Sequence, residues 1–413
     1  MSKPAMLLCM MTLLLGACSQ NQPSVPRDTA AATSGAAPDA GDSDTATSTD
    51  TATSQAELQD LAVTPTPSSS STAVRPDGTL MVGNQAFFPM GFYHVSWAGN
   101  ATRRMRDMNA IADLGFNVMN ATMFDPQDDL DGYRTLLASA RNRGMKLLVE
   151  DFNDVSIQSL KSDPAVLGWM IADDCNRLVT PEALQTRNQH VKALDPDHLT
   201  YASMAISFSN SHAAYFGKSD AIGNQSYPVD DGGDPVSVVY PVMKQLVTES
   251  RVNGTLPIAN LQSFRWPNGR YPTTRELYSM TNQALGAGVK GILYYTYLDS
   301  TNDMNTQPLL RTELKKITGE VKLLAPLLMN GQKEEVPTTN GDVKVNVWTL
   351  GNLRYLQVLN LSDTNRHNLT LKLPGNTSTL AAVFSGRPVT MKLKSGSITG
   401  ALDPLTAQWY ALR

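Results

Sequence analysis

Two adjacent carboxylic acids, Asp173 and Asp174, follow directly after the uncharged apolar run Val166–Ala172. A short apolar run with Pro164 just before it is typical of a strand that is buried on both faces. In a parallel α/β barrel, side chains at the carboxyl ends of the strands line the mouth in which active sites lie. Because successive residues of a strand point to opposite sides, we expect at most one of the two aspartates to face such a mouth, and we favour Asp174. The alternative is structural, because acidic residues after a strand often cap the next helix.

Residues that suit sugar recognition stand at the other predicted strand ends. Aromatic rings offer flat faces to pyranose rings, and polar or acidic groups can form hydrogen bonds with sugar hydroxyls. The aromatic candidates are Tyr93, Tyr227, Trp266, Tyr294, Tyr295 and Tyr297. The polar and acidic candidates are His94, Asn120, Glu150, Asp151, Asp173, Asp174, Gln225, Gln262 and Asp299. Any one of them could be an ordinary rim or core residue, so it is their clustering at one end of the predicted strands that indicates a carbohydrate site.

Signatures of several other functions are missing from the sequence. The five histidines are scattered without the spacing of metal ligands. No Gly-x-Ser-x-Gly motif and no phosphate-binding loop occur. A net charge of −4 without a basic cluster argues against nucleic acid as a partner. We therefore expect no metal, no cofactor and no nucleic acid.

The elements that would position these residues alternate between strands and helices. After a hairpin around Gly83-Asn84, strands are expected at residues 87–93, 116–121, 145–150, 166–172, 199–203, 220–224, 256–261 and 291–297. Helices are expected at residues 105–114, 130–143, 156–161, 181–194, 235–248, 273–285 and 309–324. About eight such units over ~250 residues predict a TIM (β/α)8 barrel at residues 74–328. An open doubly wound sheet also alternates, but it usually has a glycine-rich turn after its first strand, and none is present here.

The pattern changes after Leu328. Short, partly alternating apolar runs are separated by Gly, Asn, Asp or Pro as far as the C-terminus. This pattern predicts a small β-sandwich domain at residues 329–413. We expect its role to be structural, as a domain that packs on the barrel.

The N-terminus has the features of an export signal. Lys3 precedes an apolar core at residues 6–15, which is too short to span a bilayer. The following Leu15-Gly16-Ala17-Cys18 resembles the lipobox of bacterial lipoproteins. The resemblance implies removal of residues 1–17, lipidation of Cys18 and membrane anchoring, and Ser19 favours the outer membrane. The alternative is a plain secretory signal with an incidental cysteine.

Residues 18–73 are dominated by Ser, Thr, Ala, Asp and Pro. Such a segment buries too little apolar surface to offset the entropy of ordering, so we expect a disordered tether. After processing, Cys175 would be the one remaining thiol besides Cys18, so we expect no disulfide framework.

From about Thr79 onwards the sequence resembles TIM-barrel glycoside hydrolases and glycosidase-like proteins of bacterial envelopes. The residues that carry the resemblance are FFPMGFY (87–93), VLGWMIADDC (166–175), DAIGNQSYP (220–228), PTTREL (272–277) and GAGVKGILYYTY (286–297).

The resemblance implies roles for individual residues. Relatives read W-x-I-x-D-E-P at the fourth strand, where the glutamate is the general acid/base, and that role passes to Asp174, with Asp173 beside it. Relatives usually place a second carboxylate at the end of the seventh strand, where this chain has Gln262, and Glu276 lies in the following helix. Glu150, Asp151 or Asp299 would then activate water or act as the nucleophile.

Two functions follow as expectations. The first is a monomeric, membrane-anchored glycoside hydrolase of a poly- or oligosaccharide, with Asp174 as the general acid/base. The second is a catalytically degenerate surface lipoprotein that binds carbohydrate on the same barrel.

Overall fold

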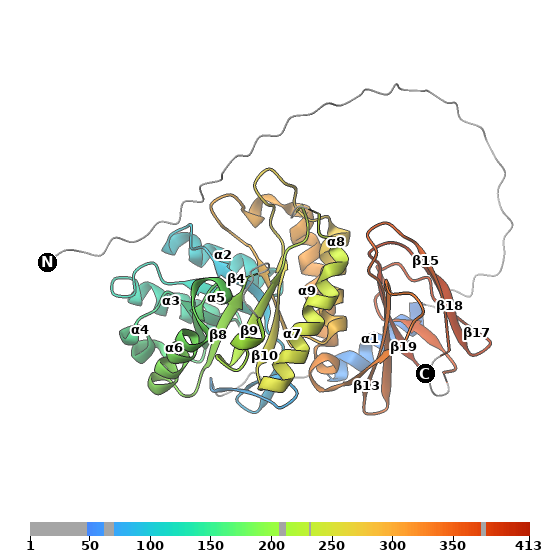
Figure 1. Cartoon of the computed structure of the whole chain (residues 1–413), viewed down its shortest axis with the longest axis horizontal. Helices are drawn as coiled ribbons and strands as arrows, with labels where there is room; N and C mark the ends of the chain where they lie inside the picture. Colours follow the sequence, from blue (N-terminus) through green and yellow to red (C-terminus); the bar gives the residue numbers. More distant parts are fainter. Residues whose placement is uncertain (1–47, 62–69, 206–211, 231–232, 373–376) are drawn as a thin grey trace, which may run out of the picture. The chain divides into compact units, whose positions relative to one another are not determined.

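The computed structural model describes residues 48–61, 70–205, 212–230, 233–372 and 377–413 (Figure 1). Eight parallel strands close into a barrel in the order β10-β11-β4-β5-β6-β7-β8-β9. Their bounds are β4 Met90–Val95, β5 Val118–Thr122, β6 Lys146–Glu150, β7 Val166–Ala172, β8 Leu199–Met204, β9 Ala221–Ser226, β10 Leu256–Gln262 and β11 Gly291–Tyr295. The predicted TIM barrel is therefore confirmed.

Helices between the strands cover the outside of the barrel (Figure 1). They are α2 Ala101–Asp113, α3 Leu130–Asn142, α4 Asp154–Leu160, the short α5 Cys175–Leu178, α6 Pro181–Leu194, α7 Val239–Asn253, α8 Thr274–Ala287 and α9 Pro308–Asn330. The start of α6 follows from its sequence, because Thr180 Oγ1 accepts a hydrogen bond from Ala183 N at 3.2 Å and Pro181 occupies the first helical position.

The barrel interior is packed below the mouth. Tyr201 donates a hydrogen bond to Asn260 Oδ1 at 2.9 Å across the interior. Gly223 makes room for this bond, since a Cβ atom there would lie 2.1 Å from the Tyr201 hydroxyl. At the opposite end, the hairpin of β2 Leu80–Val82 and β3 Gln85–Phe87, joined by β1 Thr72–Val74, packs Leu80 and Val82 against the interior residues. The site therefore stands on a filled core, not above a pore.

The C-terminal segment forms two antiparallel sheets, as expected for a β-sandwich. One has the order β12-β13-β14-β19-β16 and the other β15-β18-β17. Their bounds are β12 Gln332–Val336, β13 Val343–Leu350, β14 Leu353–Asn360, β15 His367–Leu371, β16 Leu380–Ala382, β17 Lys392–Lys394, β18 Ser397–Leu402 and β19 Ala407–Leu412. Val345, Val358, Ile398 and Leu402 are among the residues of its buried core.

The sandwich packs on the barrel through α8 and α9. Trp409 Nε1 donates to Asn282 Oδ1 at 2.8 Å, and Gln357 Nε2 donates to the carbonyl of the same asparagine at 3.0 Å. Arg387 lies over the Tyr278 ring at 3.7 Å and donates to Glu313 and Glu320 of α9.

The prediction of a disordered tether is wrong for its C-terminal part. Ser48–Leu61 forms helix α1, and Leu58 in that helix is fully buried. Gln55 Nε2 donates to the carbonyl of Val383 at 2.9 Å, and Arg413 donates to Glu57 at 3.0 Å. Composition alone misses this helix because its buried surface is supplied by α9 and by the sandwich, not by its own neighbours. Cys18 and the predicted signal peptide lie outside the described residues.

The bounds of several elements also differ from the prediction. The first barrel strand is β4, which begins after Pro89, where residues 87–93 were expected. Helix α9 continues to Asn330 although Pro326 lies inside it.

Within the described part of the chain, no helix is both long and apolar enough to cross a membrane.

Candidate active site

Residues with left-handed backbone lie near the carboxyl ends of three barrel strands, β4, β6 and β7. The φ angles are 53° at His94, 56° at Asp151 and 41° at Asp174. Non-glycine residues rarely adopt this conformation, and such residues cluster at functional sites. Here the left-handed turns redirect the chain at the mouth of the barrel.

A cavity of about 290 Å³ lies at this mouth. Its lining consists of Tyr93, His94, Asp173, Asp174, Gln225, Tyr227, Phe264, Arg265, Trp266, Pro267, Tyr295, Asp299, Thr301 and Asn302. Both aspartates belong to it, so the expectation that at most one would face the mouth is wrong. The alternation of side chains holds only inside the strand, and β7 ends at Ala172 before either aspartate.

Asp173 is the more enclosed of the two carboxyl groups. Burial raises its pKa to about 6, while His94 lowers it and the neighbouring Asp174 and Glu150 raise it. Its Oδ1 atom is buried and has no hydrogen-bond partner among the described residues. A carboxyl group of this kind holds its proton at mildly acidic pH, as a general acid must.

The side chain of Asp174 is held in place by groups that donate hydrogen bonds or carry positive charge. Gln225 Nε2 donates to its Oδ1 atom at 2.8 Å, and Arg177 Nη1 lies 3.8 Å from its Oδ2 atom. Asp174 occupies the N-cap position of α5, but its side chain makes no capping hydrogen bond. The helix-cap alternative therefore does not describe this side chain. Gln225 also donates to the Tyr93 hydroxyl at 2.9 Å, which ties the aspartate to the aromatic side of the cavity.

Glu150 lies beneath His94. Its Oε1 atom is 2.5 Å from His94 Nδ1, and Thr122 Oγ1 donates to Oε2 at 3.2 Å. Burial alone would lower the pKa of His94, but Glu150, with Asp173 and Asp151, raises it to about 9. At neutral pH the His94 side chain in the site is therefore an imidazolium. Burial of its carboxyl group and the charge of Glu150 raise the pKa of Asp151 to about 6, and His94 opposes this.

Aromatic rings form one side of the cavity. The hydroxyls of Tyr93 and Tyr227 are 2.7 Å apart, and Trp266 Nε1 donates to the carbonyl of Tyr227 at 3.3 Å. Phe264 stands perpendicular to Tyr227 with ring centroids 5.1 Å apart. Tyr295 also lines the cavity, so four of the aromatic candidates named from the sequence are brought together.

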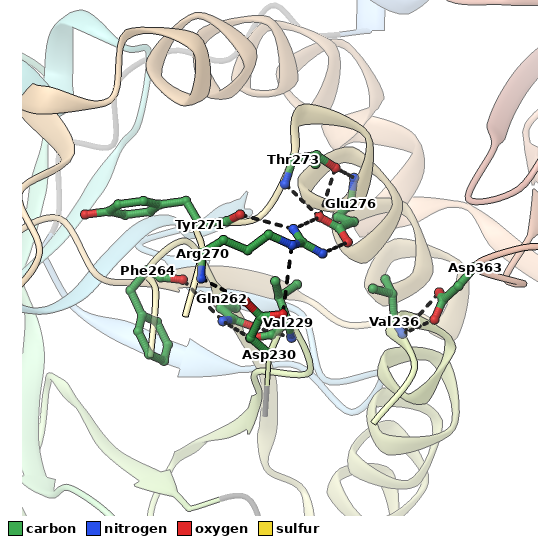
Figure 2. Close-up of polar contacts among 10 residues, drawn as sticks. All are labelled: Val229, Asp230, Val236, Gln262, Phe264, Arg270, Tyr271, Thr273, Glu276 and Asp363. Atoms are coloured by element: carbon green, nitrogen blue, oxygen red, sulfur yellow. Dashed lines mark hydrogen bonds and ion pairs between the residues drawn. The ribbon is translucent and has the colours of Figure 1, made fainter. Parts of the chain in front are cut away.

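Six of the residues named from the sequence do not line the cavity and are corrected here: Asn120, Glu150, Asp151, Gln262, Tyr294 and Tyr297. Tyr294 is fully buried, and its hydroxyl lies 2.7 Å from that of Thr281. Asn120 is fully buried and accepts a hydrogen bond from His94 N at 2.6 Å, so it supports the loop after β4. Gln262 is fully buried as well, and its amide is paired with Val229 N at 2.7 Å and Val229 O at 2.9 Å (Figure 2). Tyr297 lies behind the sheet against Phe92. Their positions follow from side-chain direction, which strand-end spacing alone does not reveal.

The first carboxyl group after β10, that of Glu276, has a structural role. Glu276 accepts two hydrogen bonds of 2.7 Å from Arg270 and forms a capping box with Thr273 at the start of α8 (Figure 2). Arg270 N in turn donates to Asp230 Oδ2 at 2.8 Å, which joins the loops after β9 and β10. Glu276 does not line the cavity.

The cavity also contains residues that the sequence did not single out. Phe264, Arg265 and Pro267 come from the loop after β10, and Thr301 and Asn302 from the loop after β11. Asp299 Oδ1 shapes the second loop by accepting hydrogen bonds from Thr301 N at 2.7 Å and Asn302 N at 2.6 Å. In the sequence, the only feature that could have identified these loop residues is that they lie close to a predicted strand end. In the described residues, no group of three or more His, Cys, Asp or Glu is placed to hold a metal ion.

No family model matches this chain, and a search of curated proteins finds no match. Solved structures do resemble it. One is the alpha-amylase from Geobacillus thermoleovorans in complex with acarbose, at 14% identity and a TM-score of 0.53, covering 79% of this chain and 98% of that one. A structure described as a glycoside hydrolase has 14% identity and a TM-score of 0.56, covering 84% and 98%. Eubacterium rectale Amy13B has 10% identity and a TM-score of 0.55, covering 83% and 97%. At such identities the likeness shows the fold alone, which is the TIM barrel of glycoside hydrolases with a C-terminal β-domain.

Proposed function

We propose that this chain is a glycoside hydrolase that acts on a poly- or oligosaccharide, with Asp173 and Asp174 as its catalytic residues. The observation that carries the proposal is the Asp173 carboxyl group, whose pKa is raised to about 6 by burial, in a cavity lined by aromatic rings at the end of the fourth barrel strand. A proton donor next to flat apolar surfaces is what cleavage of a glycosidic bond requires.

The sequence led us to expect Asp174 as the general acid/base. The contacts in the cavity favour Asp173 in that role instead. Asp173 donates its proton to the glycosidic oxygen as the bond to the anomeric carbon breaks. Asp174, which accepts a hydrogen bond from Gln225 and lies near Arg177, stabilises the positive charge on the sugar. Water then adds to the anomeric carbon and returns a proton to Asp173.

The test compares Asp173→Asn and Asp174→Asn with the wild type, after a substrate has been found by screening polysaccharides for release of reducing ends. Asp173→Asn should lower turnover of an unactivated glycoside by ~10²–10⁴-fold. An aryl glycoside with a good leaving group needs less protonation and should be affected much less. If only Asp174→Asn shows this difference between the two substrates, the acid is Asp174.

A carbohydrate-binding protein without activity is the second candidate. The observation in its favour is the end of β10, which carries the buried amide of Gln262 and no carboxylate. Under this alternative the wild type binds a glycan and releases no sugar, and both aspartate variants bind as well as the wild type.

We further propose that the protein is a monomeric lipoprotein of the outer membrane, anchored through Cys18. The support is the sequence Leu15-Gly16-Ala17-Cys18. Cys18→Ser should move the protein from the membrane fraction to the soluble fraction, and unchanged fractionation of this variant would exclude the lipid anchor.

A further inference from the structure

Trp97 is an exposed tryptophan at the rim of the barrel. It lies in the loop between β4 and α2 and is 40% exposed. Trp169, Trp348 and Trp409 are at most 3% exposed. Since burial of an indole is strongly favourable, an exposed one next to an active-site cavity suggests a binding surface.

The Trp97 ring is fixed in place from one side. It stacks on His94 with ring centroids 5.5 Å apart and an angle of 29° between the planes. His94 is itself held by Glu150 at 2.5 Å. The loop is anchored by the buried Ser96, whose hydroxyl donates to Asp107 at 2.9 Å. Because His94 covers one face of the indole, the exposed surface lies on the other face and the edges.

Trp97 also continues the aromatic side of the cavity. The ring centroids of His94 and Tyr295 are 6.2 Å apart, and those of Tyr295 and Tyr227 are 6.1 Å apart with nearly parallel planes. Tyr227 leads on to Trp266 at 6.3 Å. The last four of these residues line the cavity, whereas Trp97 does not. The aromatic surface therefore extends beyond the space that holds Asp173.

The charges at the mouth indicate the kind of glycan. The cavity lining contains three carboxyl groups, those of Asp173, Asp174 and Asp299, against the two cationic groups of His94 and Arg265. Whether Asp173 is protonated or ionised, the lining has no excess of positive charge to pair with a chain that carries a negative charge on each sugar. An uncharged chain needs no such excess.

We propose that Trp97 forms an outer subsite, in which a sugar ring of an uncharged glycan chain stacks on the exposed indole face while another unit occupies the cavity at Asp173. The inference rests on the proposed function and adds to it a substrate class, namely uncharged chains of several units. Short oligosaccharides fill the cavity alone, and longer ones reach Trp97 as well.

The test measures binding by calorimetry. The ligands are cellobiose, xylobiose and maltose with their five-unit counterparts, and pentagalacturonate as the charged ligand. For the five-unit ligand that binds the wild type, Trp97→Ala should weaken affinity by about 2- to 10-fold, and Trp97→Phe should retain most of it. Affinity for the matching disaccharide should not change. Val252→Ala is the control, because Val252 is 79% exposed and does not line the cavity.

The outcomes separate the two proposals. If the wild type binds a five-unit chain and Trp97→Ala binds it equally well, or loses affinity for both lengths alike, Trp97 is no outer subsite and the proposed function stands. If pentagalacturonate binds more tightly than every uncharged ligand, the assignment to uncharged chains is wrong. A wild type that binds none of these glycans overturns the proposed function together with the subsite.

Discussion

Asp173 and Asp174 are neighbours in the chain but have different surroundings. Asp173 has a buried oxygen with no hydrogen-bond partner among the described residues, whereas Asp174 accepts a hydrogen bond from Gln225. The difference arises at the end of β7, where Asp174 takes up a left-handed conformation. A backbone turn of one residue thus places two carboxyl groups in one cavity and gives them different partners.

The raised pKa of Asp173 leads to a prediction about stability. Above about pH 6 the folded protein must hold this carboxyl group ionised in a buried place, which costs free energy that the unfolded chain does not incur. The cost is absent below the ordinary pKa of aspartate, grows as the pH rises to about 6, and is constant above it. Asp173→Asn should therefore stabilise the protein at pH 8, by on the order of 2 kcal/mol, and have little effect at pH 3.5.

The measurement is urea denaturation of both proteins across this pH range. Asp131→Asn serves as the control, because it makes the same change at a side chain that is 93% exposed. A stability gain from Asp173→Asn that is the same at pH 3.5 and pH 8 would contradict the prediction. A gain in stability combined with a loss of turnover would identify Asp173 as a residue retained for activity at the expense of stability.

At the scale of elements, buried strands were the easiest to predict. The bounds of β7 agree with the predicted residues 166–172, because an uncharged apolar run of this length is typical of a buried strand. The first strand was misplaced because Phe87 and Phe88 continue the apolar pattern of the hairpin, although Pro89 separates the hairpin from β4. The position of the site was predictable in the same way, since it follows from the strand ends. The side-chain directions of Asn120, Gln262 and Tyr297 were not, because they depend on contacts with distant segments.

Helix α1 provides a prediction at this scale. Leu58 is fully buried, whereas Leu61 on the same helix is 39% exposed. Leu58→Ala removes packed apolar surface and should destabilise the protein by about 2 kcal/mol. Leu61→Ala is the matched control and should change the free energy of unfolding by less than about 0.5 kcal/mol. Equal effects of the two substitutions in chemical denaturation would mean that α1 does not dock as described.

At the scale of the molecule, the barrel and the sandwich share buried charges. Arg387 stacks on Tyr278 and pairs with Glu313 and Glu320, all of which are at least half-buried. Burial raises the pKa of Glu320, and Arg387 opposes this. The arginine therefore favours the ionised form of Glu320 beneath the sandwich.

Removing this cation should weaken the attachment of the sandwich. Arg387→Met leaves two partly buried carboxylates without their partner and should destabilise the protein by about 3–5 kcal/mol at pH 7. The loss should be smaller at pH 4, because Glu320, whose pKa is raised by burial, can then take up a proton. Lys315→Met, which removes an exposed charge from the same helix, is the control for the change in net charge. The prediction fails if thermal unfolding shows the same loss at both pH values.

The docking of α1 also has a consequence for the order in which the protein folds. Gln55 contacts Val383 and Glu57 contacts Arg413, across separations of 328 and 356 residues. Synthesis delivers the chain from its N-terminus, so α1 emerges long before α9, β16 and β19 can offer a surface to it. Contacts across such separations form only after the intervening chain has folded. Docking of α1 is therefore expected late in folding, and a C-terminally truncated product would leave this segment open to proteolysis, marking the incomplete chain for removal.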